Sequence, residues 1–211
     1  MTEIFLKGYD GINLQGNYFE QSTNIGSYAL ILHPHPVHGG TMDNKVVFLA
    51  YKVFKNLGVN VLRYNSRGVQ KSGGEFTDGE FESKDLISVM NWICERAKAN
   101  SSTTLKMYVV GFSFGCYVLL KAFDSIKNII DKFIMIAPPS NLFDFSTFSK
   151  VDTNGLIIQG TCDDIVPVQF TDELLQNSSQ NVLYKKIDGA GHFFLNHESE
   201  LSYAIRDFIL K

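Results

Sequence analysis

Apolar residues fall into two patterns along the chain, short unbroken runs and longer stretches with helical spacing. Residues 28–32 form an unbroken apolar run, which is typical of a strand buried on both faces. Residues 42–57 instead carry apolar side chains at helical intervals and stop at Gly58, which indicates an amphipathic helix. The same criteria predict strands at 2–7, 12–19, 28–32, 59–64, 105–110, 132–137, 155–159 and 182–187, and helices at 42–57, 80–99, 116–123, 169–176 and 198–210.

Strands alternate with helices or long loops from the third strand onward, and this order predicts the fold class. Units of this kind form a mostly parallel sheet with helices on both faces. With the first two strands the sheet has about eight strands, and we find no repeat, low-complexity tract or linker that would divide the chain. We therefore expect a single α/β domain over residues 1–211, with reacting groups at the carboxyl ends of the strands.

Composition and charge narrow the range of partners. Hydrophobic residues make up 45% of the 211 residues, enough for a core without metal or disulfide staples. The formal net charge is −3 and there is no dense Lys/Arg block, so neither nucleic acid nor an anionic membrane is an expected partner. The three cysteines, Cys94, Cys116 and Cys162, suggest no disulfide framework.

The location and assembly of the protein are constrained less strongly. The first residues do not resemble a secretory signal, and no apolar stretch approaches the length of a membrane span. We therefore expect a cytoplasmic protein. The charged fraction of 19% and the 17 phenylalanines allow an apolar surface patch, for a substrate or for a second copy of the chain. A monomer and a homodimer both remain open.

One serine stands in a local context that favours nucleophilic chemistry. It is the centre of the pentapeptide Gly111-Phe112-Ser113-Phe114-Gly115, between an apolar strand and a predicted helix. A sharp strand-to-helix turn lifts such a serine hydroxyl clear of the sheet, and glycine fits where the backbones approach closely. An ordinary serine at a strand-helix junction is the alternative, so the rest of the chain must supply partners for Ser113.

An acid and a base follow the last two expected strands. Asp163 and His192 are both expected at the sheet edge that holds Ser113. Asp164 and His197 are their rivals. We prefer Asp163 for its distance from the end of the preceding strand, and His192 because it follows a glycine-rich turn directly off a strand, whereas His197 stands at an expected helix start.

These three residue types supply the parts needed for acyl transfer. A serine hydroxyl becomes a nucleophile when a base takes its proton as it attacks. An imidazole can take that proton and return it to the leaving group, and a buried carboxylate fixes the imidazole tautomer. We therefore expect Ser113 as nucleophile, His192 as base and Asp163 as the group that orients the base.

A loop with the sequence His-Pro-His-Pro-Val-His occupies residues 33–38. A zinc site is one interpretation, but Val37 stands where a dinuclear metallo-hydrolase would carry an aspartate. We expect neither a metal nor another cofactor. Because proline has no N–H, His35 and Val37 are the nearby backbone donors. We expect the amide of His35, together with that of Phe114, to form an oxyanion hole.

Arg67 lies in the polar loop after the fourth expected strand. It could bind a substrate carboxylate, or it could form a structural ion pair with an acidic residue such as Asp85. We favour the ion pair, which would hold the loop against the following helix.

Taken together, these segments resemble the α/β-hydrolase superfamily over nearly the whole chain, in the chain order Ser, Asp, His. More narrowly, they resemble small bacterial α/β-hydrolases with a His-Pro-His-Pro oxyanion loop. The matching stretches are 33–36, 39–45, 65–69, Ser72 with Gly74, 111–115, Gly160 with Asp163, Val166-Pro167, and Gly191-His192. The resemblance implies an α/β-hydrolase fold and the triad Ser113, Asp163 and His192. Ser66 and Gln70 stand where Phe and Gly are common in that group.

The spacing of the sixth and seventh expected strands leaves no room for a large cap domain. Large lids in this superfamily usually enter there, and only residues 138–155, eighteen in all, separate the two apolar runs. We expect an open site for small or exposed acyl compounds, with the Phe-rich segment 142–148 as its apolar wall.

The sequence therefore predicts a serine hydrolase that works through an acyl-enzyme intermediate on small carboxylic esters. A thioesterase, lactonase or peptidase would use the same triad. A non-catalytic binding protein on the same scaffold is the alternative of a different class. It would not need a complete triad and oxyanion elements, which favours an enzyme of the carboxylesterase type. The natural substrate remains open.

Overall fold

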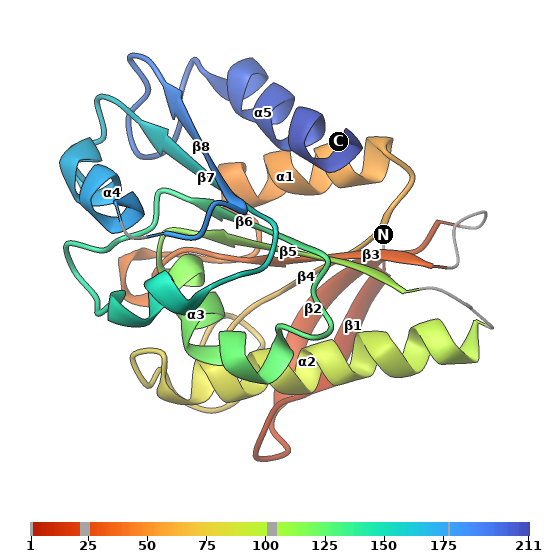
Figure 1. The fold of residues 1–211 in the computed structure, drawn as a ribbon. Coiled ribbons are helices and arrows are strands. Elements are labelled where there is room, and N and C mark those ends of the chain that lie inside the picture. Colours follow the sequence, from red (N-terminus) through yellow and green to blue (C-terminus); the bar gives the residue numbers. More distant parts are fainter. Residues whose placement is uncertain (1, 22–25, 101–104, 177) are drawn as a thin grey trace.

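The computed structural model describes residues 2–21, 26–100, 105–176 and 178–211. Within these ranges the chain forms an eight-stranded sheet in the order β1-β2-β4-β3-β5-β6-β7-β8 (Figure 1). The strands are β1 (Thr2–Lys7), β2 (Asn13–Phe19), β3 (Ser27–Leu32), β4 (Asn60–Tyr64), β5 (Lys106–Phe112), β6 (Lys132–Ile136), β7 (Gly155–Gly160) and β8 (Val182–Ile187). The helices are α1 (Lys45–Asn56), α2 (Glu80–Ala99), α3 (Phe114–Ile126), α4 (Val168–Leu175) and α5 (Glu198–Leu210), with 3-10 turns η1 (Pro36–His38) and η2 (Ser146–Lys150).

The strand directions confirm a mostly parallel sheet. Strands β3 to β8 pair in parallel, whereas β2 runs antiparallel to both β1 and β4. Parallel neighbours need long connections, and the helices supply several of them. The carboxyl ends of β3 to β8 consequently lie along one edge of the sheet, where the loops that follow them can meet.

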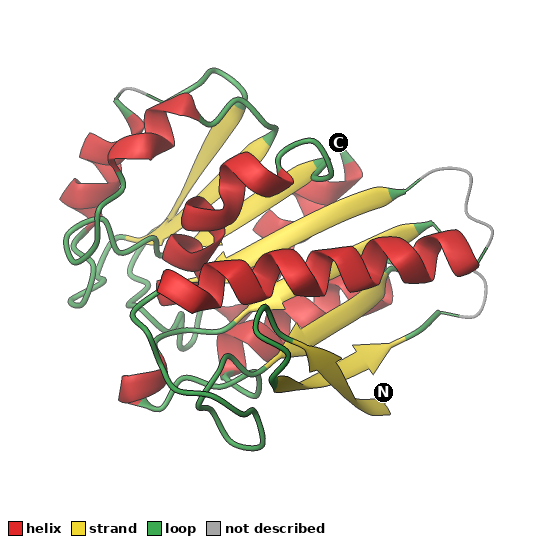
Figure 2. Cartoon of the chain, turned by 90° about the horizontal axis from the view of Figure 1, so that it is seen from below, coloured by secondary structure: helices red, strands yellow, loops and turns green. Residues whose placement is uncertain are grey.

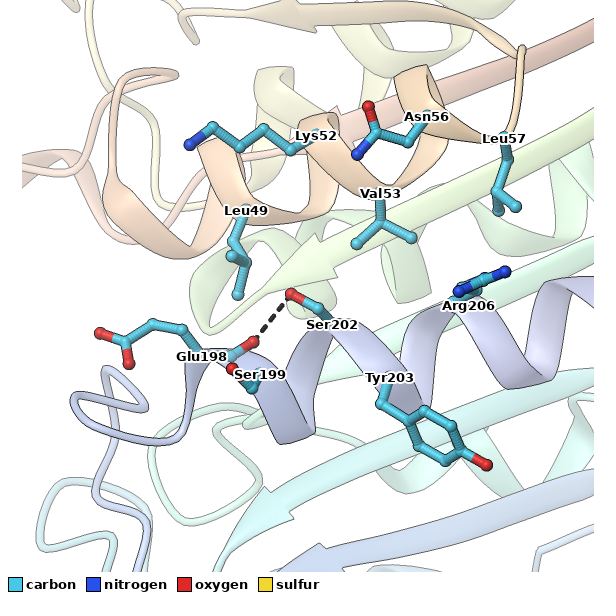
Figure 3. A pocket seen from close by; sticks show the side chains of 10 residues that line it. All are labelled: Leu49, Lys52, Val53, Asn56, Leu57, Glu198, Ser199, Ser202, Tyr203 and Arg206. Atoms are coloured by element: carbon cyan, nitrogen blue, oxygen red, sulfur yellow. Dashed lines mark hydrogen bonds between the residues drawn. The ribbon is translucent and has the colours of Figure 1, made fainter.

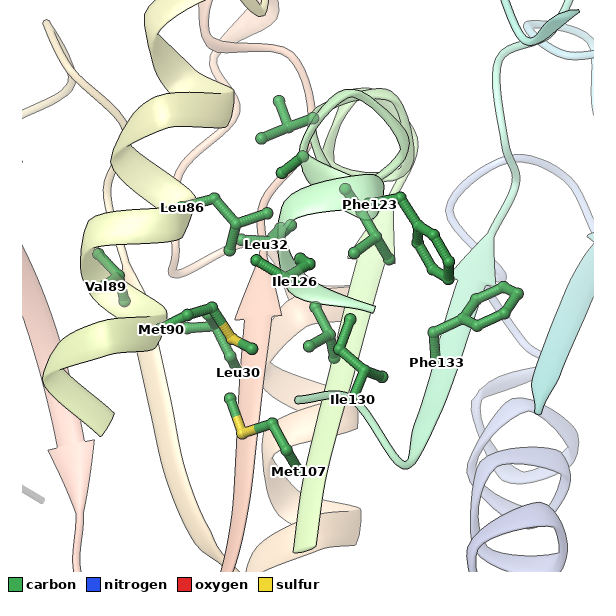
Figure 4. Packing of buried hydrophobic residues seen from close by; sticks show 14 of the residues in the cluster. Leu30, Leu32, Leu86, Val89, Met90, Met107, Phe123, Ile126, Ile130 and Phe133 are labelled. Carbon is green, nitrogen blue, oxygen red and sulfur yellow. The ribbon is translucent and has the colours of Figure 1, made fainter. Parts of the chain in front are cut away.

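Helices cover both faces of the sheet (Figures 1 and 2). On one face lie α1 and α5, and on the other lie α2 and α3. Side chains of a strand point alternately to opposite faces. In β3, Leu30 and Leu32 therefore pack with α2 and α3 (Figure 4), while Ala29 and Ile31 pack with α1 and α5. A strand that is apolar on both faces thus requires this three-layer arrangement.

Local interactions set the helix boundaries more finely than the apolar pattern does. Helix α1, predicted from residue 42, begins at Lys45 because Asn44 caps it. The Oδ1 atom of Asn44 accepts the Val46 N–H at 2.9 Å, which satisfies one of the unpaired amides of the first turn. The helix predicted over 116–123 extends from Phe114 to Ile126.

The longest helix, α2, is amphipathic and belongs to the α2–α3 layer. Its buried apolar residues are Leu86, Val89, Met90, Ile93 and Ala97. Polar side chains occupy much of the remaining surface, so the helix covers the sheet with one face and meets water with the other. Among the described helices, none is long and apolar enough to cross a membrane.

Candidate active site

Ser113 occupies the sharp turn between β5 and α3. Its backbone has φ 52° and ψ −119°, in a region that residues with a Cβ rarely adopt. A Cβ on Gly111 would lie 2.6 Å from the carbonyl oxygen of Gly115, and a Cβ on Gly115 would lie 2.8 Å from that of Leu32. The two glycines therefore permit the close backbone contacts that place the serine at the tip of the turn.

Three side chains singled out in the sequence meet in the loops at the carboxyl ends of β5, β7 and β8. The Nε2 atom of His192 lies 3.1 Å from Oγ of Ser113, and its Nδ1 atom lies 2.8 Å from Oδ2 of Asp163. None of the three residues is more than 9% exposed. A carboxylate can only accept a hydrogen bond, so Nδ1 of His192 carries the imidazole proton and donates it to Asp163. The lone pair on Nε2 then faces the serine hydroxyl.

The two rival residues lie outside this group. Asp164 is exposed to solvent. The Nδ1 atom of His197 lies 2.7 Å from Oε2 of Glu200, at the start of α5. Asp163 and His192 are therefore hydrogen-bonded to each other, whereas Asp164 faces solvent and His197 pairs with Glu200.

Asp163 is held by donors on both of its oxygens. Its Oδ1 atom accepts the backbone N–H groups of Ile165 at 3.0 Å and Val166 at 2.8 Å. Its Oδ2 atom accepts from Nε2 of Gln159 at 3.0 Å, in addition to His192. The sequence reasoning missed Gln159. The available signal was a long polar side chain at the end of an otherwise apolar strand.

The first histidine of the loop 33–38 is engaged by the protein at both ring nitrogens. Nδ1 of His33 donates to the carbonyl oxygen of Pro34 at 2.7 Å, and Nε2 accepts the Ser66 N–H at 2.9 Å. Burial lowers the pKa of His33 to about 4, so its ring is neutral at pH 7. No ring lone pair of His33 is left for a metal ion. Over the described residues, no group of three or more His, Cys, Asp or Glu side chains is placed to hold one.

Near Ser113, the backbone amides of His35 and Phe114 have no hydrogen-bond partner within the part of the chain that the structure describes. The Val37 N–H instead donates to Nδ1 of His35 at 3.3 Å. The Gly40 N–H binds the carbonyl oxygen of His35 at 3.0 Å, which holds the loop in place. Of the two loop donors considered from the sequence, only the His35 amide is therefore available to a ligand.

A cavity of about 240 Å³ opens beside Ser113. Its lining is mostly apolar and includes three histidines, and among the described side chains no Asp, Glu, Lys or Arg takes part in it. Leu142 and Phe143 line it, as the predicted wall at 142–148 requires. Phe145 and Phe148 do not, because they are buried in the core formed with α2 and α3. The apolar wall is therefore the first part of the segment, and its last part anchors the loop.

The chain was compared with known proteins, and no protein-family model matches it. An uncharacterized protein of Rickettsia prowazekii (strain Madrid E) is 35% identical over 218 residues, which cover 100% of this chain and 89% of the relative. A solved structure from Agrobacterium tumefaciens, described as a candidate α/β-hydrolase of unknown function, is 30% identical with a TM-score of 0.89, covering 99% of this chain and 94% of that one. XC6422 from Xanthomonas campestris, described as an α/β serine hydrolase without lid, is 30% identical with a TM-score of 0.87, covering 99% and 93%. The chain belongs to the α/β-hydrolase family.

Membership of this family supports hydrolase activity in general terms, and the fold agrees with the lidless relative. Between β6 and β7 the hydrolase has only a loop with the five-residue turn η2 (Ser146–Lys150). No cap domain lies in this fully described connection, so the expectation of a hydrolase fold without a large cap is confirmed.

A larger hollow of about 650 Å³ lies between α1 and α5 of the hydrolase (Figure 3). Charged and polar side chains line much of it, including Lys52, Glu198 and Arg206. It shares no lining residue with the cavity at Ser113. Size alone therefore does not identify the reactive site, whereas groups able to exchange a proton do.

Arg67 of the hydrolase forms the predicted ion pair with Asp85. Its Nε atom lies 2.8 Å from Oδ2 and its Nη2 atom 2.9 Å from Oδ1 of Asp85, and Asp10 approaches Nη2 at 3.3 Å. Burial disfavours the guanidinium charge, but the hydrogen bonds and charges of the two aspartates outweigh it and raise the pKa of Arg67. The ion-pair interpretation is confirmed, and Arg67 is not among the residues that line the cavity.

Gln70, which the resemblance places where glycine is expected, has a backbone φ of 50°. This conformation favours glycine. The side chain partly offsets the strain, since its Oε1 atom accepts from Nδ2 of Asn65 at 2.8 Å. The departure from glycine therefore adds a hydrogen bond within the loop.

Proposed function

We propose that this protein is a serine hydrolase of the carboxylesterase type, which cleaves small carboxylic esters through an acyl-enzyme intermediate. The observation that carries the proposal is the hydrogen-bonded sequence from Ser113 Oγ through His192 to Asp163, at 3.1 and 2.8 Å. It ends at a cavity large enough for a small organic group. A protein that only bound a ligand would not need this arrangement.

In the first half of the proposed reaction, Ser113 Oγ attacks the ester carbonyl carbon while Nε2 of His192 takes its proton. Asp163 accepts Nδ1–H throughout, which holds the imidazole in place and stabilises the imidazolium. The imidazolium then gives its proton to the departing alkoxide oxygen, and the alcohol leaves. The acyl group remains bound to Ser113 as an ester.

In the second half, a water molecule gives a proton to Nε2 of His192 and attacks the acyl carbon. The proton returns to Ser113 Oγ, and the carboxylic acid is released. In both halves a negative oxygen forms on the former carbonyl, and the unpartnered amides of His35 and Phe114 are assigned to it. Each such donor contributes about 3 kcal/mol of transition-state stabilisation. No cofactor is assigned to any step.

The cavity supports a small and uncharged group as the part of the substrate nearest to Ser113. At about 240 Å³ it lies below the ~300–1,000 Å³ common for ligand pockets. A carboxylate or phosphate there would meet the apolar side chains of Leu142, Phe143 and Ile165, and no Lys or Arg of the described residues lines the cavity to pair with it. Losing its hydration shell without compensation would disfavour binding.

The proposal is tested by turnover of short p-nitrophenyl esters and by labelling with a fluorophosphonate probe. We expect wild type to hydrolyse p-nitrophenyl acetate and to be labelled. Ser113→Ala should remove the labelling and lower kcat by about 10⁴-fold or more, because no nucleophile remains.

A matched control is Ser202→Ala, on α5 in the other hollow (Figure 3), where the hydroxyl donates to the Glu198 carbonyl oxygen. Labelling and kcat should remain at the wild-type level in this variant. A wild-type protein that neither labels nor cleaves any ester would contradict the proposed function. Full activity in Ser113→Ala would contradict the assignment of the nucleophile.

A further inference from the structure

Gln159 is the buried polar side chain beside Asp163 to which the proposed mechanism assigns no role. We propose that Gln159, oriented by Thr171, is a positioning residue that fixes the carboxylate of Asp163 toward His192. Its effect on turnover rests on the proposed function. The hydrogen bonds that it controls exist without turnover, so they can be measured independently.

Because Gln159 is buried, its amide needs hydrogen-bond partners within the protein. The residue is 0% exposed near the end of β7, in a strand otherwise made of apolar residues and glycine. A primary amide transferred from water into such a place is strongly disfavoured unless its polar atoms find partners. Its oxygen and nitrogen both have partners, so the site is built around an amide and not around an alkyl chain.

These partners determine which way the amide faces. The Nε2 atom donates to Oδ2 of Asp163 at 3.0 Å and to the carbonyl oxygen of Val166 at 2.9 Å. The Oε1 atom accepts from the hydroxyl of Thr171 at 3.1 Å. A rotated amide would aim its oxygen at two acceptors, so only one orientation satisfies the network.

The Gln159 amide completes the support of the carboxylate. The Ile165 and Val166 amides hold Oδ1 of Asp163, and Gln159 holds Oδ2. The position of Oδ2 is therefore set by the protein before His192 is considered. The same hydrogen bond disperses negative charge on Oδ2, so its removal should strengthen the interaction of Asp163 with a protonated imidazole.

Thr171 connects this support to α4. It is also 0% exposed, and its hydroxyl must donate to Gln159 because Oε1 can only accept. Valine has almost the same shape but no hydroxyl, so Thr171→Val would remove the group that selects the amide orientation. Serine retains the hydroxyl, which makes Thr171→Ser the conservative variant.

The groups that face His192 define what a pH profile can report. Within the described residues, Asp163 is the carboxylate hydrogen-bonded to His192, and Ser113 is its other partner. His35 and His38 line the same cavity. The acid limb of kcat/KM, where activity rises as the base loses its proton, therefore reports His192 together with these neighbours.

The test compares Gln159→Met, Gln159→Glu, Thr171→Val and Thr171→Ser by kcat and KM for p-nitrophenyl acetate from pH 5 to 9. In Gln159→Met we expect kcat about 10-fold lower, an almost unchanged KM, and an acid limb at higher pH. In Gln159→Glu the new carboxyl group, buried against Asp163, should stay protonated and donate to Oδ2, so the limb should move less than in Gln159→Met. Thr171→Val should show a smaller decrease in kcat and a smaller shift of the acid limb. Thr171→Ser, which keeps the hydroxyl, should behave like wild type.

A proton NMR spectrum supplies the readout that does not depend on turnover. The Nδ1–H proton of His192, in its hydrogen bond to Asp163, should give a resonance far downfield that shifts in Gln159→Met and in Thr171→Val. The control is Gln15→Met, which removes a buried amide on β2 that bonds to Asn65 instead. It should lower Tm without moving the resonance or the acid limb.

The possible outcomes separate this inference from the proposed function. A folded Gln159→Met or Thr171→Val protein with wild-type kcat, acid limb and resonance would overturn the positioning role. If the wild type cleaves no ester, the proposed function is refuted. If the His192 Nδ1–H resonance nevertheless shifts in Gln159→Met and Thr171→Val, the positioning role is supported. Should Gln159→Met not fold, the Thr171→Val and Thr171→Ser pair decides.

Discussion

Two buried polar clusters of this hydrolase use similar materials and differ in how they end. In each, a nitrogen-bearing side chain lies 2.8 Å from an aspartate that is at most 5% exposed. Arg67 and Asp85 satisfy each other and their neighbours within the protein. His192 and Asp163 instead continue to Ser113, whose hydroxyl borders a cavity. The His192 cluster can therefore react with another molecule, because its end at Ser113 is open to the cavity, whereas the Arg67 cluster is satisfied within the protein.

The chemistry of the nitrogen-bearing side chain sharpens the contrast. A guanidinium keeps its proton under all ordinary conditions, so the Arg67 cluster can only hold elements together. An imidazole exchanges its proton near neutral pH, so the His192 cluster can move one. Equivalent substitutions in the two clusters should therefore affect different quantities.

The largest effect is expected for Asp163→Asn. The backbone amides of Ile165 and Val166 would retain the oxygen of the new amide, which turns its NH2 group toward Nδ1 of His192. The imidazole would then carry its proton on Nε2 and could not accept one from Ser113. We expect kcat to fall by about 10⁴-fold, measured with p-nitrophenyl acetate. A loss smaller than tenfold in a folded variant would refute the orienting role of Asp163.

The matched change Asp85→Asn should affect stability instead of turnover. It removes one charge from a buried ion pair and leaves Arg67 undercompensated, which we expect to lower the free energy of unfolding by about 3 kcal/mol. Urea denaturation measures this loss. For the folded fraction, kcat should remain within a few-fold of wild type. If Asp85→Asn instead lowered kcat as strongly as Asp163→Asn, the proposed division between the two clusters would be wrong.

A smaller effect is expected from His33, which links the two regions by accepting the Ser66 N–H beside Arg67. Burial lowers its pKa from 6.5 to about 4 in the folded state. Between pH 6.5 and pH 4, His33 is protonated in the unfolded chain but neutral in the folded chain. The free energy of unfolding therefore decreases as the pH falls from about 6.5 to 4. The loss reaches up to about 3 kcal/mol at the lower end, and less than that at pH 5.

Comparison with His33→Gln isolates this contribution, since glutamine has a donor and an acceptor but does not titrate. The free energy of unfolding should fall between pH 7 and pH 5 more steeply in wild type than in the variant. Parallel pH dependences of the two proteins would show that His33 does not titrate as expected.

The sequence was sufficient for the fold because its dominant signals are local. Apolar runs and helical spacing predicted the strands and helices to within a few residues. The pentapeptide around Ser113 and the turns that precede Asp163 and His192 also lie at strand ends, and parallel strands bring such ends together. An ion pair of Arg67 with an acidic residue such as Asp85 could be proposed because the helix that follows the loop carries several acidic residues.

Other features depend on distances that no local pattern encodes. Gln159 is separated from Thr171 by a turn and the start of α4, and nothing in their spacing shows that one fixes the other. Phe143 and Phe148 look alike in the sequence, yet one lines the cavity and the other fills the core. The choice between them follows from the path of the loop, which the described structure reveals and the composition of the segment does not.

The short connection between β6 and β7 has a kinetic consequence. Enzymes with lids commonly wait for a microsecond-to-millisecond closing or opening step, which can limit turnover. Here no cap has to close over Ser113, so arrival of a small ester should be governed by diffusion and by fit. In the proposed mechanism, water would reach an acyl group on Ser113 by the same route. Selectivity in such a site has to come from the fixed walls of the cavity, without a moving part to reject the wrong substrate.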